Sequence, residues 1–172
     1  MSSFEAKRIV KEYTQAVSAS ASEVFPLLCP VREYDWIDGW KSEIVYSDSG
    51  VAENNCIFRS HLSERGEELW VVSRYDPENF AIEFTTFNRI GLVMKLDISV
   101  EDHGTEGTVV RFRHTFTGLN EQGNQFVAEY TDTKYQEMMG FLGKSLDHYC
   151  TTGRMLKKPT LIHGLHSVLR GH

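Results

Sequence analysis

The sequence predicts an α+β domain in which a curved antiparallel β-sheet wraps around a long C-terminal helix, with two short helices after the first strand. Residues 55–117 are a series of segments of alternating polarity separated by turn signals, which is typical of an antiparallel meander. Residues 124–150 contain no proline and repeat apolar side chains at helical spacing. A short apolar helical segment separates the first strand from the meander, and this order of elements defines the predicted class.

Length and composition are those of an ordinary globular domain. The chain has 172 residues, of which 41% are hydrophobic and 24% charged, enough for one domain with a substantial core. The net charge of -6 argues against a nucleic-acid partner, because binding to the phosphate backbone needs clustered Lys and Arg. No apolar run approaches the roughly 20 residues of a membrane span, and the polar N-terminus lacks the centre of a signal peptide.

The cysteines and histidines predict neither disulfides nor a metal site. Cys29, Cys56 and Cys150 are scattered and odd in number, which favours a reducing, cytoplasmic compartment. His163 and His166 share a helical spacing, but no Cys, Asp or Glu ligand accompanies them in the tail. Because no phosphate-binding loop, hydrolase elbow or dinucleotide fingerprint is present either, we expect no metal and no other cofactor.

The chain begins with a predicted strand over residues 9–17. Ser20 or Ser22 is expected to cap the short apolar helix that follows, with Glu23 in its first turn. Pro30 ends this helix, and the aromatic stretch 34–40 predicts a second short helix or an ordered loop. A strand over residues 41–47 then ends at the turn 47–50.

Four hairpins are predicted in the meander, turning at residues 65–66, 76–79, near 88–89, and 102–107. Paired strands must put their apolar residues on the same side, so we derive one apolar face and one polar face. Trp70 and Val72 are assigned to the polar face. The predicted pairs on the apolar face include Ser60 with Val71, Phe58 with Ser73, Val71 with Phe84, Phe84 with Met94, and Met94 with His114.

One helix of about 27 residues, roughly 40 Å long, is predicted over residues 124–150. Its apolar stripe consists of Val127, Thr131, Tyr135, Met138, Leu142, Leu146 and Tyr149. Gly153 is a plausible C-terminal stop, which divides the chain into a domain of residues 1–153 and a tail of residues 154–172. The tail has a small apolar set, and we expect either a short docked helix or a contact in a homodimer.

Several local motifs resemble those of a known superfamily. Residues 19–28 resemble its first-helix signature, and the tryptophan-bearing segment 36–40 resembles the one that follows. Tyr75-Asp76-Pro77 resembles its turn between meander strands, and residues 115–119 resemble the end of its last strand. Together with the order of elements, these motifs resemble the START-like superfamily, also called Bet v 1-like, SRPBCC or polyketide cyclase/dehydrase-like, over roughly residues 7–150.

The resemblance implies a helix-grip fold with a ligand cavity between the apolar sheet face and the long helix. Members include ligand carriers, lipid-transfer modules, hormone receptors, aromatase/cyclases and chaperone cofactors, so the fold does not select one function. The expected ligand-binding residues are Phe58, Ser60, Val71, Ser73, Phe84, Met94, Leu96 and Phe112 from the sheet, with Tyr135, Met138 and Leu142 from the helix. The alternative is that these side chains only fill the core.

Three functions are consistent with this fold. The first is binding or transport of a small hydrophobic or aromatic molecule. The second is a cyclase/dehydratase-type enzyme with His114 as acid/base and Tyr75 as hydrogen-bond donor, although a core histidine satisfied by a neighbouring hydroxyl is the favoured interpretation of His114. The third is a protein-interaction module, indicated by Trp70 and Phe87 on the polar face and by the apolar tail. The scarcity of ionisable groups on the apolar face favours binding over catalysis.

Overall fold

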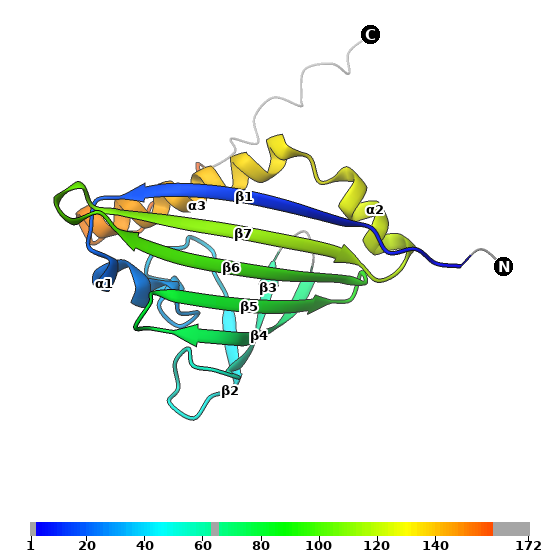
Figure 1. The fold of residues 1–172 in the computed structure, drawn as a ribbon. Coiled ribbons are helices and arrows are strands. Elements are labelled where there is room, and N and C mark those ends of the chain that lie inside the picture. Colours follow the sequence, from blue (N-terminus) through cyan, green and yellow to red (C-terminus); the bar gives the residue numbers. More distant parts are fainter. Residues whose placement is uncertain (1–2, 63–65, 160–172) are drawn as a thin grey trace, which may run out of the picture.

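A seven-stranded antiparallel sheet curves around the C-terminal helix in the order β1-β7-β6-β5-β4-β3-β2 (Figure 1). The computed structural model describes residues 3–62 and 66–159. The strands are β1 (Arg8–Val17), β2 (Ser42–Tyr46), β3 (Ile57–Leu62), β4 (Gly66–Asp76), β5 (Ala81–Asn88), β6 (Leu92–Asp102) and β7 (Thr108–Gly118). The four hairpins of the meander are confirmed, and every pair of neighbouring strands is antiparallel.

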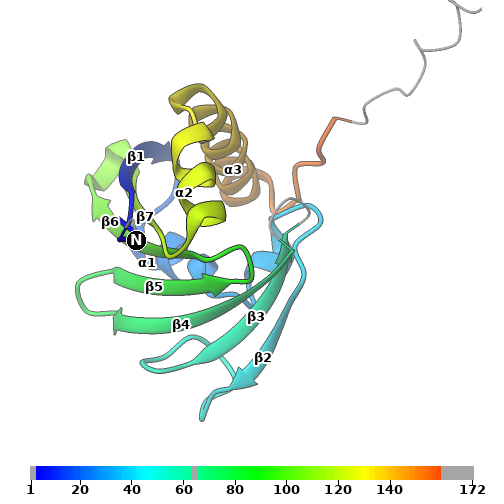
Figure 2. The ribbon, with the colours of Figure 1, turned by 90° about the vertical axis from the view of Figure 1, so that its right-hand side faces the viewer.

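The helices lie on the inner side of this curved sheet, and Figure 2 shows α2 and α3 above it. They are α1 (Ala21–Val24), α2 (Glu121–Glu129) and α3 (Asp132–Thr152), with 3₁₀ turns η1 (Phe25–Leu28), η2 (Glu33–Asp35) and η3 (Gly104–Glu106). Helix α3 packs along β1, and α2 crosses β7. None of the helices in the described ranges is long and apolar enough to cross a membrane. The predicted fold class, a curved sheet around a C-terminal helix, is confirmed.

The single long helix predicted over residues 124–150 is wrong, because the chain breaks between α2 and α3. Tyr130 leaves the helical conformation with φ -80° and ψ 87°. Thr131 then caps α3, since its hydroxyl accepts a hydrogen bond from the Lys134 amide at 3.3 Å. The break changes which side of the helix faces the sheet, so Met139 is buried while Met138 is 43% exposed.

The hairpin between β3 and β4 has a different register from the predicted one. Leu62 pairs with Gly66, which moves the pairing by three residues and so exchanges the two faces of the first half of β4. A β-bulge at Ser73, where the register with β5 shifts between Val72 and Arg74, then reverses the alternation again. Tyr75, beyond the bulge, therefore faces the core as expected.

Three predicted pairs are wrong for this reason: Phe58 with Ser73, Ser60 with Val71, and Val71 with Phe84. The observed partner of Phe58 is Trp70, and that of Ser60 is Glu68. Trp70 and Val72, expected on the polar face, are buried on the inner face at 8% and 0% exposure.

The pairs predicted between β5, β6 and β7 lie on the correct face but in a register two residues away. Leu96, rather than Met94, lies opposite His114, and it also pairs with Phe84. Met94 pairs with Thr86. A shift of two residues in register keeps every side chain on the same face of the sheet, so the apolar face was predicted correctly although the register was not.

Ser20 is the cap of α1, which resolves the choice between the two serines. The Ser20 amide and hydroxyl both donate to the Glu23 carboxylate, at 2.9 and 2.7 Å. We expect Ser20→Ala to lower the free energy of unfolding by about 1 kcal/mol in urea denaturation, because the hydroxyl contact of the capping box is lost while the amide contact remains. Ser22→Ala is the matched control and is expected to change it by only a few tenths of a kcal/mol. Equal losses for both variants would contradict the assignment.

The chain after α3 returns toward η2. Gly153 ends α3 in the left-handed conformation, with φ 67°. Leu156 forms a bridge to Ile37, and the Lys157 ammonium lies 2.9 Å from the Asp38 carboxylate. The division of the chain at residue 153 stays a prediction, and the apolar part of the tail, within residues 160–172, lies outside the described residues.

Candidate functional site

The inner face of the sheet brings together most of the predicted sheet residues. Ser60 lies among them and accepts a hydrogen bond from the Trp70 indole at 2.9 Å. The rings of Phe58, Trp70 and Phe84 pack on one another with centroids 5.4 to 6.0 Å apart. The predicted sheet residues that are buried on this face are Phe58, Ser60, Phe84, Met94, Leu96 and Phe112.

Three predicted ligand-binding residues lie elsewhere. Val71 pairs with Ile57 and Thr85 on the outer face, because the shifted hairpin exchanges the faces of that half of β4. The Ser73 hydroxyl, in the bulge, is on the exposed side and donates to the Glu83 carboxylate at 2.8 Å. Met138 is exposed, because the break before α3 turns Met139 toward the sheet. The prediction that these three side chains face the interior between the sheet and the helix is wrong.

His114 is buried on the inner face, as predicted, and its partner is Tyr135 of α3. The Nδ1 atom of His114 lies 3.0 Å from the Tyr135 hydroxyl, within hydrogen-bond distance. The imidazole also stacks on Phe116, with ring centroids 5.7 Å apart. Burial raises the pKa of Tyr135, so its hydroxyl stays protonated near neutral pH. The pair forms a polar contact between sheet and helix.

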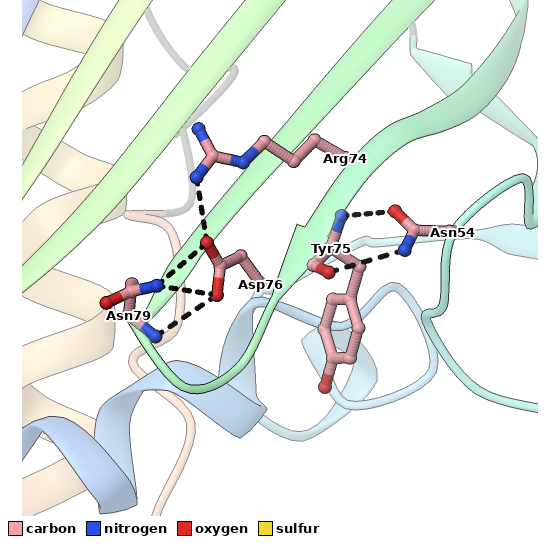
Figure 3. Close-up of polar contacts among 5 residues, drawn as sticks. All are labelled: Asn54, Arg74, Tyr75, Asp76 and Asn79. Atoms are coloured by element: carbon pink, nitrogen blue, oxygen red, sulfur yellow. Dashed lines mark hydrogen bonds and ion pairs between the residues drawn. The ribbon is translucent and has the colours of Figure 1, made fainter.

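Tyr75 does not lie next to His114. The Asn54 side chain accepts a hydrogen bond from the Tyr75 amide at 2.7 Å and donates one to the Tyr75 carbonyl at 3.5 Å (Figure 3). The Tyr75 ring stacks on Phe25, with ring centroids 5.6 Å apart. Strands β4 and β7 are separated by β5 and β6, so the two side chains start three strand spacings apart, roughly 14 Å. Tyr135, rather than Tyr75, supplies the hydroxyl at His114.

Lys11 is a further ionisable group on the inner side of the sheet. It lies directly opposite His114 in the pairing of β1 with β7. Its ammonium forms an ion pair with Asp132 in the first turn of α3. The alternation of polar and apolar residues in β1 gave no signal for it, because the polar residues of an edge strand read as solvent-exposed.

Glu33, in η2, is an ionisable group that the sequence analysis missed. Residues three apart share a side of a 3₁₀ turn, so Glu33 lies on the same side as the buried Trp36. Burial raises the pKa of its carboxyl to about 8, although part of the residue's surface remains accessible. The exposed polar neighbours Arg32 and Asp35 make this stretch read as a surface segment. The only indication in the sequence that Glu33 is partly buried was its spacing of three residues from Trp36.

Apolar side chains that flank η2 in the chain, or lie on β2 and α3, are only partly buried and pack against the core, and we call them the apolar rim. The rim consists of Val31, Ile37, Trp40, Ile44, Leu142 and Tyr149. Helix α3 and β2 both adjoin η2, because Arg32 interacts with Tyr149 and the Ser42 hydroxyl donates to the Pro30 carbonyl at 3.4 Å. Leu142, predicted as a ligand-binding residue, belongs to the rim.

The inner face also contains buried polar groups. The Thr86 hydroxyl is fully buried, and within residues 3–62 and 66–159 it has no hydrogen-bond partner. Glu68 is fully buried as well and accepts from the Asn88 amide at 3.3 Å. Over the same described ranges, no three His, Cys, Asp or Glu side chains are grouped to hold a metal ion.

A hollow of about 470 Å³ lies on the outer face of the sheet, away from these groups. Charged side chains line it, and they form ion pairs with one another or with neighbours. Arg113 lies 3.1 Å from Glu12, and Lys95 lies 2.8 Å from Glu83. Because its charges are mutually neutralised and its lining is polar, this hollow does not suit an apolar ligand.

Comparison with solved structures identifies the architecture as a helix-grip fold. Norcoclaurine synthase from Thalictrum flavum matches with a TM-score of 0.65 and 15% identity, over 86% of this chain and 96% of that one. Ara h 8.0201 matches with a TM-score of 0.61 and 15% identity, over 84% of this chain and 99% of that one. DynU16, a putative protein in the dynemicin biosynthetic locus, matches with a TM-score of 0.59 and 17% identity, over 84% of this chain and 48% of that one. The chain has the fold of the START-like, Bet v 1-like superfamily. No protein-family model and no curated protein matches it.

Proposed function

We propose that this chain binds a small hydrophobic molecule between the sheet and α3, with the apolar rim as the entrance. The observation that carries the proposal is the rim itself. Its six side chains pack on the core but keep part of their apolar surface accessible, whereas the sheet residues beneath are buried. Accessible apolar surface beside a core whose Thr86 hydroxyl has no hydrogen-bond partner among the described residues is typical of a small-molecule site.

A neighbouring structure supports an aromatic molecule as the ligand. Norcoclaurine synthase from Thalictrum flavum has a structure in complex with dopamine and hydroxybenzaldehyde, both small aromatic compounds, and matches this chain with a TM-score of 0.60. The aromatic side chains of the inner face are suited to such a ring. The expected cytoplasmic location, the absence of a nucleic-acid partner and the possible homodimer stay predictions.

Fluorescence titration with N-phenyl-1-naphthylamine tests the proposal. We expect saturable binding to the full chain, and at least about tenfold weaker binding to Leu142→Trp, since the larger ring fills the entrance beside α3. Leu119→Trp is the matched control, because Leu119 is exposed and lies outside the rim. Circular dichroism checks that both variants are folded. Absence of saturable binding, or equal affinity of Leu142→Trp and wild type, would contradict the proposal.

A second candidate is a cyclase/dehydratase-type enzyme, and the contact between His114 and Tyr135 favours it. A buried imidazole beside a protonated hydroxyl is an arrangement that can move a proton on a bound carbonyl compound. Trp70 no longer favours the interaction module, because it is buried. Recovery of every bound polyketide in chemically unchanged form would decide against the enzyme and leave the binding function intact.

A further inference from the structure

The strand geometry of β5 holds the Thr86 side chain on the inner face of the sheet. Burial alternates along β5, and Thr86 follows the buried Ile82 and Phe84 at intervals of two residues. Successive side chains of a strand point to opposite faces, so these three share one face. Thr86 lies between Trp70 of β4 and Met94 of β6, its partners in the two ladders. The direction of its side chain therefore follows from the backbone.

The Thr86 hydroxyl is fully buried and has no hydrogen-bond partner among the described residues. Neither lateral neighbour supplies one. The Trp70 indole donates to the Ser60 hydroxyl at 2.9 Å, and an indole has one N–H and no acceptor. Met94 has only a thioether, which is a weak acceptor. Buried hydroxyls are almost always hydrogen-bonded, so this one indicates a partner other than these residues.

An isolated water molecule does not suit this position. A buried water is held by about two to four polar groups, and the apolar neighbours of Thr86 provide none. The next polar side chain along the inner face of β5, Asn88, donates to Glu68 at 3.3 Å and accepts from the Leu92 amide at 3.1 Å. A partner that apolar contacts hold in place suits the position better, because it needs only the one polar contact.

An aromatic surface for such a partner adjoins the hydroxyl. Trp70 stacks on Phe58 and meets Phe84 edge to face, with ring centroids 5.4 and 5.8 Å away. A hydroxyl both donates and accepts, so an oxygen atom complements it. We propose that Thr86 is the polar anchor of the ligand site and forms a hydrogen bond with an oxygen atom of an apolar ring compound, an inference that rests on the function proposed above.

The anchor has to be uncovered for the ligand to reach it, because the hydroxyl is enclosed in the free protein. Met94, its buried neighbour in β6, is the side chain suited to this movement. An unbranched thioether adopts several conformations with little loss of contact.

Two naphthalenes of nearly equal shape test the inference by displacement of N-phenyl-1-naphthylamine. One is 2-acetylnaphthalene, and the other is 2-isopropenylnaphthalene, which has a methylene group in place of the carbonyl oxygen. We expect the ratio of ketone affinity to hydrocarbon affinity to be about tenfold lower in Thr86→Val than in wild type, the value of one buried hydrogen bond. Thr86→Ser should retain the ratio, because serine keeps the hydroxyl.

Thermal unfolding without ligand distinguishes a ligand anchor from a hydroxyl that supports the fold. Valine has the shape of threonine but no unpartnered polar atom, so Thr86→Val should raise the Tm by about 2–4 °C. Thr115→Val is the matched control, because it makes the same change on the outer face of β7. This control should leave the affinity ratio unchanged.

An unchanged ratio in Thr86→Val would overturn the inference but not the binding function, because both naphthalenes would still bind. A lower Tm of Thr86→Val without ligand would also overturn it, since the hydroxyl would then be bonded within the protein. Failure of every probe to bind wild type would overturn the binding function and this inference together.

Discussion

Glu33→Gln is expected to raise the free energy of unfolding by about 3 kcal/mol at pH 7, and by little at pH 4.5. Burial raises the pKa of this carboxyl from its ordinary value of 4.5 to about 8 in the folded protein. As the pH rises above 4.5, the unfolded chain loses the proton while the folded chain retains it. The contribution of Glu33 to the free energy of unfolding is therefore fully present below pH 4.5 and is lost progressively up to about pH 8.

Urea denaturation of wild type and variant, from pH 4.5 to pH 8, measures this effect. The difference between the two proteins is the relevant quantity, because all other titrating groups contribute equally to both. Glu78→Gln is the matched control, since it makes the same chemical change at an exposed position. A difference for Glu33→Gln that stays constant over this range would show that the carboxyl is not held in its neutral form.

Gly123→Ala is expected to destabilise the protein by about 4 kcal/mol or more, which is the range of severe steric conflicts. A Cβ atom at residue 123 would overlap the Gly91 carbonyl oxygen and lie 3.0 Å from the Gly118 Cα atom. Both obstacles are backbone, so neither can rotate away. The Gly123 amide also donates to the Asn120 side chain, at 2.8 Å, which caps the start of α2.

Gly140→Ala is the control for Gly123→Ala, because it makes the same chemical change at a helical position where a Cβ atom meets no steric conflict. The nearest atom to a Cβ at residue 140 is the Tyr13 hydroxyl, at 4.0 Å. Alanine is the better helix former by about 1 kcal/mol, so this variant should be slightly more stable than wild type. Urea denaturation followed by circular dichroism measures both. Equal effects of the two substitutions would contradict the close approach at the junction of β7 and α2.

The alternation of side chains in the meander was sufficient to predict the strands, the hairpins and the inner face of β5 to β7. An error of two residues in register cannot move Leu96 or His114 to the other face. The first half of β4 could not be predicted in the same way, because two independent shifts act on it. The shorter hairpin reverses its faces, and the bulge at Ser73 reverses them again. Neither the shorter hairpin nor the bulge is marked by a residue pattern that can be recognised in a single sequence.

The candidate site was predictable in part for a related reason. Alternation assigns His114 to a face, but it does not give distances across the sheet, so Tyr75 was chosen where Tyr135 is the true neighbour. The stripe of the last helix was derived without its break, and Met138 was chosen instead of Met139. Glu33 lies in a run of polar residues, and only the spacing to Trp36 indicates that it faces inward.

The return of the chain toward η2 bears on how the protein should be handled. Leu156 and Lys157 attach the segment after α3 to Ile37 and Asp38, directly beside the rim. The other end of the chain is anchored far from it, where the Lys7 amide donates to the Asn124 side chain at 2.8 Å, next to α2. A fusion joined directly after residue 159 would therefore begin close to the rim, whereas one joined at the N-terminus begins beside α2 and is preferable for ligand titrations.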